Sequence, residues 1–299
     1  VGAYCTFYYN GQTARTNTAY LYVKGSTPVT PQPTEVPTGE VSGYVNDYDY
    51  ALVRNDYELQ NMNSNLAINY MLADDLDLSD TYTSFTPIGS SSTAFSGNFD
   101  GNFYTVKNLT VNTDYAGLFG KIKGTSTNYA KIMNVGIVDA SVTATAYGGG
   151  LVGYAEYADI KNVYNKQDTN TSATITAAEA GTQEITIDGG EAWASVYNAK
   201  VGGIAGYAKN SKLDSVYNAS IVDNGAGLVG VMNSSELSDA YNSGLVDNFA
   251  EYDTSEGTPT ATKHYAIVDK IEDSNGSSTI TNVYGSGKFT FYNAFYNSI

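Results

Sequence analysis

The sequence predicts an all-β fold, a parallel β-helix, from three observations. A four-residue unit of the form Gly-Leu-x-Gly recurs along the chain. In three copies a second unit, of the form Leu-x-x-Val-Tyr-Asn, follows, and its fourth residue lies ten residues after the closing glycine. Copies of the second unit recur every 24 to 28 residues, the length of one coil of short strands. Helical repeats would show apolar faces with a period of 3.6 residues, and these segments do not.

Composition narrows the possible functions. The 299 residues carry a net charge of −16, so we expect no nucleic-acid partner and no attraction to an anionic membrane. No apolar run approaches the ~18 residues of a membrane span, so no membrane insertion is expected. The single Cys and single His exclude an internal disulfide and a His-rich metal site, and no cofactor is expected. This acidic, Tyr-, Thr- and Gly-rich composition is typical of secreted or surface proteins of Gram-positive bacteria.

The first 24 residues are predicted to form a hairpin. Apolar residues alternate at positions 3–8 and 19–24, and Asn10-Gly11 favours a tight turn. Cys5 and this turn resemble the last two strands of a bacterial immunoglobulin-like domain, which implies a partial domain. Because the chain opens at Val1, we expect a processed product or a piece of a longer protein.

Residues 25–40 contain four of the six prolines and predict an extended linker. Residues 41–299 are then predicted to form the β-helix. Asn55 followed by residues 56–62 predicts a capped short helix that covers the first coil, and residues 68–78 predict that coil's first strand.

Within each coil, two apolar residues three positions apart predict a corner with both side chains directed inward. One inward column is expected to comprise Leu109, Val135, Val163, Val216, Ala240 and Val283. Two later intervals between copies, of 53 and 43 residues, are interpreted as nearly two repeat periods each. A further copy at residues 196–198 lies inside the 53-residue interval.

A tyrosine follows the inward residue of the second unit, where strand alternation directs it outward. The expected ladder is Tyr164, Tyr197, Tyr217, Tyr241 and Tyr284. Stacked rings either stabilise neighbouring coils or form an aromatic platform for sugar rings or a partner protein. The candidate ligand-binding residues are Tyr164, Tyr197, Tyr217, Tyr241 and Trp193. The next residues, Asn165, Asn198, Asn218 and Asn242, are expected to form an internal asparagine ladder.

Two insertions interrupt the period. Residues 166–192 predict a protruding hairpin, with strands near residues 174–176 and 184–187, beside Trp193. Residues 247–265 form the second insertion and include His264. Loops that project from a repeat array often carry binding specificity, although tolerated insertions without a ligand explain them equally well.

An acidic cluster is the main candidate for chemistry. Asp74, Asp75, Asp77 and Asp80 are close in sequence, and hydrolysis of a glycosidic bond needs two carboxylates. Asp75 and Asp77 are also weak candidates for Ca²⁺. The favoured interpretation is that these residues cap and solvate the first coil. Two G-x-G-x-x-G matches, at residues 148–153 and 225–230, belong to the repeat and precede a β-type segment, which disfavours a dinucleotide site.

A family resemblance follows from longer segments. Residues 69–80 (NYMLADDLDLSD), residues 85–111 and the four Gly-Leu-x-Gly units resemble the GLUG-motif family of bacterial surface proteins. The resemblance spans residues 55–285 and implies a right-handed parallel β-helix in an adhesin-like protein. Some members are non-catalytic parts of IgA-protease-type zinc metallopeptidases, but this chain has no His-Glu-x-x-His, so peptidase activity is not implied.

The expected function is a non-enzymatic extracellular surface or adhesin module, which binds a glycan or a host or neighbouring surface protein or serves as a stalk or fibre subunit. The alternative is a carbohydrate-active β-helix enzyme or tailspike-like protein that uses Asp74, Asp75 and Asp77. The N-terminal hairpin is a candidate for self-assembly, through strand addition to a neighbouring molecule.

Overall fold

The computed structural model describes most of the chain from residue 50 onward and a short hairpin near the N-terminus. The described residues are 6–9, 12–15, 50–187, 190–249, 252–253, 260–261, 267–273, 276–285 and 289–292. The chain divides into two compact units, Val1–Thr34 and Glu35–Ile299. The predicted linker at residues 25–40, Cys5 and His264 lie outside the described residues.

The first unit contains an antiparallel hairpin of β1 (Thr6–Tyr9) and β2 (Gln12–Arg15). Tyr9 pairs with Gln12, so the connection is two residues long, as the Asn10-Gly11 signal predicts. The second strand was expected at residues 19–24, but the strand that pairs with β1 begins directly after the turn. A two-residue connection requires this, because the next residues are already opposite the first strand. Residues 19–24 lie outside the described residues.

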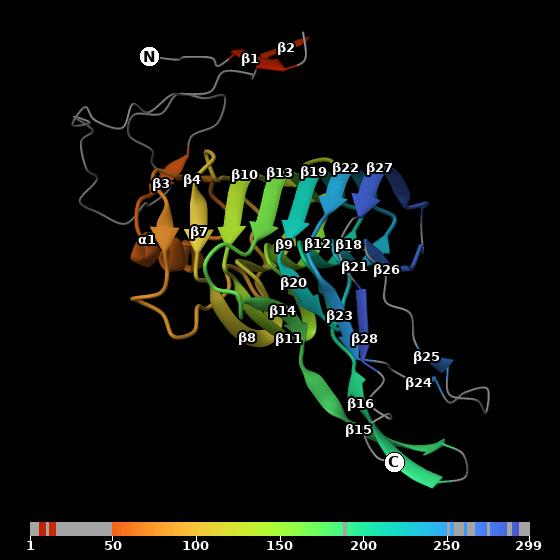
Figure 1. Cartoon of the computed structure of the whole chain (residues 1–299). Helices are drawn as coiled ribbons and strands as arrows, with labels where there is room; N and C mark the ends of the chain where they lie inside the picture. Colours follow the sequence, from red (N-terminus) through yellow and green to blue (C-terminus); the bar gives the residue numbers. More distant parts are fainter. Residues whose placement is uncertain are drawn as a thin grey trace. The chain divides into compact units, whose positions relative to one another are not determined.

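The second unit is all-β, with three parallel sheets (Figure 1). Sheet 1 contains β3 (Ala51–Val53), β4 (Tyr70–Leu72), β5 (Leu76–Asp77), β6 (Phe99–Asp100), β7 (Thr105–Lys107), β10 (Ala130–Val138), β13 (Ala158–Lys166), β19 (Lys212–Ala219), β22 (Glu236–Asn242) and β27 (Thr279–Gly285). Sheet 2 contains β8 (Thr110–Ala116), β11 (Ser141–Gly149), β14 (Thr174–Ala177), β17 (Lys200–Gly202), β20 (Ile221–Asp223), β23 (Val246–Phe249) and β28 (Phe289–Tyr292). Sheet 3 contains β9 (Phe119–Lys123), β12 (Val152–Glu156), β18 (Ala205–Lys209), β21 (Val229–Asn233) and β26 (Val268–Ile271).

The chain visits sheets 1, 2 and 3 in turn. Strands β10, β11 and β12 make one such pass, which we call a level, and β19, β20 and β21 make another. Each strand pairs in parallel with its counterpart in the next level, and β10, β13, β19, β22 and β27 lie side by side in Figure 1. Equivalent residues therefore lie directly beside one another from level to level.

The predicted corner in the second unit is present. Its third residue adopts a left-handed backbone conformation at five levels, with φ between 48° and 56° at Asn134, Asn162, Ser215, Asp239 and Asn282. At the first four of these levels the flanking apolar residues, such as Leu213 and Val216, are no more than 1% exposed. Asn, Asp and Ser fit here because short polar side chains tolerate this conformation.

The inward column is confirmed for Val135, Val163 and Val216, which pair in sequence, and for Ala240, which pairs with Val283. The prediction for Leu109 was wrong. Strand β10 pairs with both β6 and β7, and residues 101–104 between them lie opposite only residues 134–135. The two extra residues shift the register, so Gly101 lies against Val135 and Leu109 lies beside Ala140.

The two long intervals between copies of the second unit were expected to span two repeat periods each. Each is instead a single level that contains an insertion. Val163 pairs directly with Val216 across 53 residues, and Ala240 pairs with Val283 across 43 residues.

The first insertion is an antiparallel hairpin of β15 (Glu179–Ile187) and β16 (Gly190–Tyr197), which extends beyond the sheets in Figure 1. The expected strand near 174–176 is not part of it, because β14 pairs in parallel with β11 and β20. The second insertion contains β24 (Tyr252–Asp253) and β25 (Thr260–Ala261), also antiparallel.

Buried amides confirm most of the asparagine ladder. The Nδ2 atom of Asn165 donates to Oδ1 of Asn218 at 3.1 Å, and Nδ2 of Asn218 donates to Oδ1 of Asn242 at 2.9 Å. All three residues are 0% exposed. Asn198 was wrongly included: it follows the inserted hairpin and is exposed.

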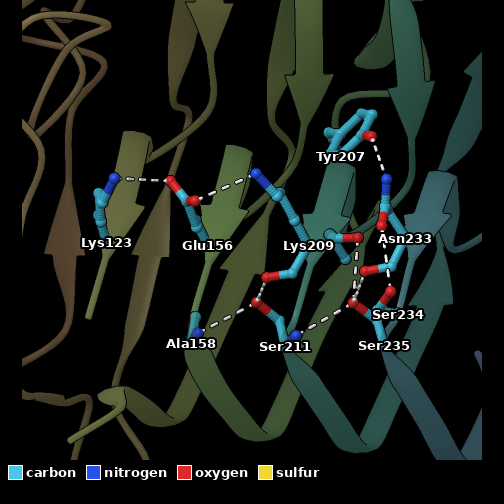
Figure 2. Close-up of polar contacts among 10 residues, drawn as sticks. Lys123, Glu156, Ala158, Tyr207, Lys209, Ser211, Asn233, Ser234 and Ser235 are labelled. Carbon is cyan, nitrogen blue, oxygen red and sulfur yellow. Dashed lines mark hydrogen bonds and ion pairs between the residues drawn. The ribbon is translucent and has the colours of Figure 1, made fainter. Parts of the chain in front are cut away.

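A second buried ladder was not predicted and joins sheet 3 to sheet 1. Figure 2 shows the hydroxyl of Ser211 accepting from Ala158 N, and the hydroxyl of Ser235 accepting from Ser211 N, both at 3.0 Å. Each serine satisfies a backbone amide of the preceding level at a corner where no strand pairing does so.

The Gly-Leu-x-Gly units stack at the corner between sheets 2 and 3. Their second residues, Leu118, Leu151, Ile204 and Leu228, are 0% exposed. A Cβ atom at Gly203 would lie 2.3 Å from the carbonyl oxygen of Gly227 and 2.4 Å from Cγ of Asn218. A larger residue would therefore push adjacent levels apart.

The predicted cap is present. Helix α1 (Asp56–Asn61) begins after Asn55, whose side chain accepts from Glu58 N at 2.8 Å, and a 3-10 turn, Met62–Ser64, follows. Leu59 and Met62 are fully buried against the core. The predicted strand at 68–78 is divided into β4 and β5, and β3, which precedes the helix, already pairs with β4.

We predict that Asn218→Ala lowers the free energy of unfolding by about 2–3 kcal/mol, because it leaves buried ladder partners unsatisfied. Asn198→Ala, at an exposed asparagine outside the ladder, is the matched control and should change it by less than about 0.5 kcal/mol. Denaturant unfolding followed by circular dichroism measures both. Equal effects of the two substitutions would contradict a stabilising ladder.

Candidate functional site

The predicted tyrosine ladder lies on the outer face of sheet 1. Tyr164 pairs with Tyr217, Tyr217 with Tyr241, and Tyr241 with Tyr284. The rings of Tyr217 and Tyr241 are stacked, with centroids 5.6 Å apart and planes at 4°. Exposure increases toward the last level, to 37% at Tyr241 and 66% at Tyr284. Stacked rings cover each other's flat faces, so their edges and hydroxyl groups are what they present to solvent.

Two predicted site residues lie elsewhere. Tyr197 belongs to β16, pairs with Glu179 across the hairpin and packs against the core, so its inclusion in the ladder was wrong. It follows Val196, as Tyr164 and Tyr217 each follow a valine, but Val196 lies in an insertion. Trp193 is also on β16, opposite Glu184. The hairpin therefore separates both residues from Tyr164, Tyr217 and Tyr241.

A second tyrosine cluster was missed by the sequence analysis. It consists of Tyr115 on β8, Tyr147 on β11, Tyr154 on β12 and Tyr207 on β18, where the outer faces of sheets 2 and 3 meet. Tyr154 and Tyr207 directly follow the closing glycine of two Gly-Leu-x-Gly units. That repeated Gly-Tyr pair was the available signal, whereas Tyr115 and Tyr147 come from the neighbouring sheet and carry no comparable pattern.

The rings of this cluster are in close contact. Tyr154 and Tyr207 are stacked at 4.9 Å with planes at 5°, and Tyr147 meets both edge-on at 5.1 and 5.6 Å. Tyr115 lies 5.0 Å from Tyr147. The ammonium of Lys121 lies 5.2 Å from the centroid of Tyr154, a distance suited to a cation–π contact. Burial raises the pKa of the Tyr154 phenol, and the charge of Glu156 adds to this, so the group stays protonated at neutral pH.

A row of charged groups lies two residues further along the same strands (Figure 2). Glu156 stands between two lysines, with Lys123 Nζ at 3.0 Å and Lys209 Nζ at 3.3 Å. Burial opposes ionisation of Glu156, but the two lysines outweigh it and hold its pKa below the usual value. The Tyr207 hydroxyl accepts from Asn233 Nδ2 at 3.1 Å and donates to Glu272 at 3.4 Å. This face thus combines neutral phenols with fixed charges.

The acidic cluster is engaged in structural hydrogen bonds. Oδ1 of Asp75 accepts from the backbone N and Oγ1 of Thr105, at 2.8 and 2.9 Å. Oδ1 of Asp77 accepts from Asn108 Nδ2 at 2.8 Å, and this bond lowers the pKa of Asp77. Oδ1 of Asp74 accepts from the amide of Asp75.

These bonds join the early levels of sheet 1, as the capping interpretation predicts. Within the described residues, no group of three or more His, Cys, Asp or Glu side chains is arranged to hold a metal ion. No helix among them is long and apolar enough to cross a membrane. The two G-x-G-x-x-G segments lead into β12 and β21 rather than into helices.

Two carboxylates lie side by side on sheet 2. Asp223 on β20 pairs with Asp247 on β23. Thr176 Oγ1 donates to Asp223 at 3.3 Å, whereas Oδ1 of Asp247 is buried without a hydrogen-bond partner among the described residues. Burial raises the pKa of both carboxyl groups, and the charge of Asp247 adds to the rise at Asp223.

Comparison with known proteins identifies no family. No model of a protein family matches the sequence, and no curated protein matches it. One similar solved structure is a Bacteroides ovatus protein provisionally named an immunoglobulin A1 protease, with 16% identity, a TM-score of 0.48, and coverage of 80% of this chain and 84% of that chain. Another is named IgA1 protease, with 13% identity and a TM-score of 0.48; the match covers 95% of this chain and 18% of that chain.

We predict that Asp247→Asn raises stability at pH 7 and that this gain shrinks as the pH falls toward 4. A carboxyl group with a raised pKa in the folded state binds its proton more tightly there, so the native charge costs stability above that pKa, and protonation relieves the cost. The exposed Asp80→Asn substitution is the control, because it changes the net charge equally without altering a buried carboxylate. Thermal unfolding at several pH values measures both, and a pH-independent difference for Asp247→Asn would contradict the coupling.

Proposed function

We propose that the chain is a non-enzymatic extracellular surface module of the GLUG-motif type, built as a right-handed parallel β-helix. The observation that carries this proposal is the in-register pairing of whole levels, visited by the chain in the order of sheets 1, 2 and 3. Arrays of this kind have extended faces and suit display rather than enclosure of a small substrate. The acidic composition and the single cysteine favour a location on a bacterial surface.

Interlocking side chains support a stalk. Asparagine amides bond from level to level inside, and the serine ladder closes another corner. On the outside, Lys161 pairs with Asp214 at 2.8 Å, which joins β13 to β19. Such cross-links resist separation of the levels along the stack. The β15–β16 hairpin, which carries Trp193 and Tyr197, is an appendage on this support (Figure 1).

The candidate binding surface is the outer face of sheet 1 at Tyr217 and Tyr241. Tyr side chains provide apolar area together with a polar hydroxyl and are enriched where proteins bind partners. The Tyr217 hydroxyl lies 2.8 Å from Ser243 Oγ, so ring edges and hydrogen-bonding groups are presented together. This combination suits a glycan or a protein surface.

Catalysis by the acidic cluster is disfavoured by its contacts. A general acid or nucleophile must approach the substrate, but Asp75 and Asp77 each accept two hydrogen bonds from the chain itself. The carbohydrate-active enzyme remains an outcome that the following experiment detects.

We predict binding without turnover on a glycan array combined with a reducing-sugar release assay. Tyr241→Ala should weaken binding of the recognised glycan roughly five- to thirtyfold, the effect of losing about 1–2 kcal/mol at an interface centre. Tyr57→Ala, at an exposed tyrosine on α1, is the matched control and should leave binding unchanged. Release of reducing sugar that Asp75→Ala abolishes would overturn the proposal in favour of an enzyme.

A further inference from the structure

Three neighbouring strands of sheet 3 carry an excess of positive charge. Strands β9, β12 and β18 contain one acidic residue, Glu156, and three lysines, Lys121, Lys123 and Lys209. The chain as a whole has 31 acidic and 15 basic residues, so this patch has the opposite sign to the net charge of the molecule. The next strand, β21, has no charged residue, and Lys270 on β26 is paired with Glu272 at 2.6 Å. A local patch of positive charge attracts anionic groups even when the whole chain is acidic.

The lysines of this patch are accessible, whereas its carboxylate is shielded. The side chain of Glu156 is 13% exposed and lies between those of Lys123 and Lys209, which are 50% and 35% exposed (Figure 2). One carboxylate cannot neutralise both ammonium groups. The third lysine, Lys121, forms no ion pair within the described residues, and its ammonium lies over the ring of Tyr154. A ligand that approaches this surface therefore meets ammonium groups before the carboxylate.

Three phenol groups beside the lysines supply further hydrogen-bond donors. The hydroxyls of Tyr115, Tyr147 and Tyr154 make no hydrogen bond to any described residue, whereas the Tyr207 hydroxyl bonds to two neighbours. Burial raises the pKa of Tyr115 and Tyr154, so both remain donors at neutral pH. Because β12 lies between β9 and β18, Lys121 and Tyr207 cover opposite faces of the Tyr154 ring. A ligand therefore reaches the edge and the hydroxyl of that ring rather than its face.

These groups are arranged for an extended ligand. Two columns run from level to level: Tyr154 lies beside Tyr207, and two residues further along the same strands Glu156 lies beside Lys209. Neighbouring levels are ~4.8 Å apart, so phenol and ammonium donors recur along a line. The matching ligand is a chain with many oxygen acceptors and sparse negative charges. A uronic-acid polysaccharide has both, through its hydroxyl and ring oxygens and its carboxylates.

Ligands of higher charge density fit this surface less well. A nucleic acid carries one phosphate per nucleotide, and its affinity depends on neutralising several phosphates with lysine or arginine. Here three lysines share the surface with one glutamate, and the net charge of −16 repels a dense polyanion. Asp114, the residue before Tyr115 at the edge of the surface, adds to that repulsion, and its carboxylate accepts a hydrogen bond from Thr145.

We propose that this surface binds a uronic-acid polysaccharide, through Lys121, Lys123, Lys209, Tyr115, Tyr147 and Tyr154. The lysines pair with carboxylates of the ligand, and the phenol hydroxyls donate to its sugar oxygens. The site lies at the corner of sheets 2 and 3 and shares no residue with the sheet 1 surface at Tyr217 and Tyr241. It therefore goes beyond the binding surface proposed there and does not depend on it.

Calorimetric titration of the intact chain with polygalacturonate, hyaluronan and alginate, in calcium-free buffer, tests the site. We expect binding of at least one of the three, with an affinity that falls as salt is added, because salt screens exposed charges. The neutral methyl ester of the bound polymer should bind at least about tenfold more weakly. Binding of none of the three, or equal binding of the methyl ester, overturns the proposal. Tighter binding of poly-L-glutamate or of dextran sulfate overturns the choice of a carboxylated polysaccharide.

Three substitutions assign the site to these residues. Lys121→Gln should weaken binding about five- to tenfold, and Tyr154→Phe, which removes only a hydroxyl, about threefold. Glu156→Gln should tighten binding about threefold or more, because it removes the carboxylate that competes for Lys123 and Lys209. A purely structural role of Glu156 does not predict tighter binding. Unchanged affinity for Lys121→Gln, or a Glu156→Gln variant that does not bind more tightly, overturns the proposal.

Two matched controls lie on sheet 1. Lys212→Gln changes the net charge as Lys121→Gln does, at a lysine that is 49% exposed and paired with Glu236, and should leave the affinity within about twofold. Tyr241→Ala should also leave it unchanged. Loss of polysaccharide binding in Tyr241→Ala but not in Lys121→Gln places the ligand on sheet 1 and overturns this proposal alone. The opposite result supports this site whether or not the sheet 1 surface binds a glycan.

Discussion

Parallel pairing in register is the constraint on which the rest of the structure depends. When one level pairs residue for residue with the next, each side chain lies beside its counterpart at the spacing of neighbouring strands, ~4.8 Å. Every position along the repeat must therefore tolerate a copy of itself at that distance. Apolar residues such as Val163 and Val216 meet the requirement by packing, and buried amides such as Asn165 and Asn218 meet it by donating to one another. Glycine is required where backbones of adjacent levels approach too closely for a Cβ, as at Gly203.

In-register pairing is unfavourable for ionisable groups, because identical charges on neighbouring levels repel each other at this spacing. On sheet 3 the sequence alternates sign across levels, and Glu156 lies between two lysines whose charges favour its ionised form. On sheet 2 the sign of the charge does not alternate from level to level. Asp223 and Asp247 lie side by side there, and the pKa values of both carboxyl groups are raised. The charge pattern along a column, rather than the overall charge, thus decides which carboxylates stabilise the stack.

The parts of the fold that could be predicted from the sequence are those that depend on local repetition. The corner motif recurs with the same residue types, so the inward column through Val163 and Val216 could be predicted from the sequence. Leu109 was misplaced because residues 101–104 add two positions without altering the motif. Tyr197 was misassigned because a hairpin carries the same Val-Tyr-Asn letters. The cluster around Tyr154 was missed because it joins two sheets, and no periodicity within one strand reports contacts across a corner.

The ends of the stack follow from the same constraint. An interior level satisfies its backbone and apolar groups through two neighbours, whereas a terminal level has only one, so each end leaves strand edges and core side chains without partners. At the N-terminal end the chain meets this cost with a different element: an Asn-capped helix inserts Leu59 and Met62 where another level would otherwise pack. The helix covers core side chains at this end, while β3 is the outermost described strand of sheet 1 there. At the other end β27 keeps the side-chain pattern of an interior level, with Ile280 in a core position. Its residue types therefore follow the same column rule as the levels that have a neighbour on each side.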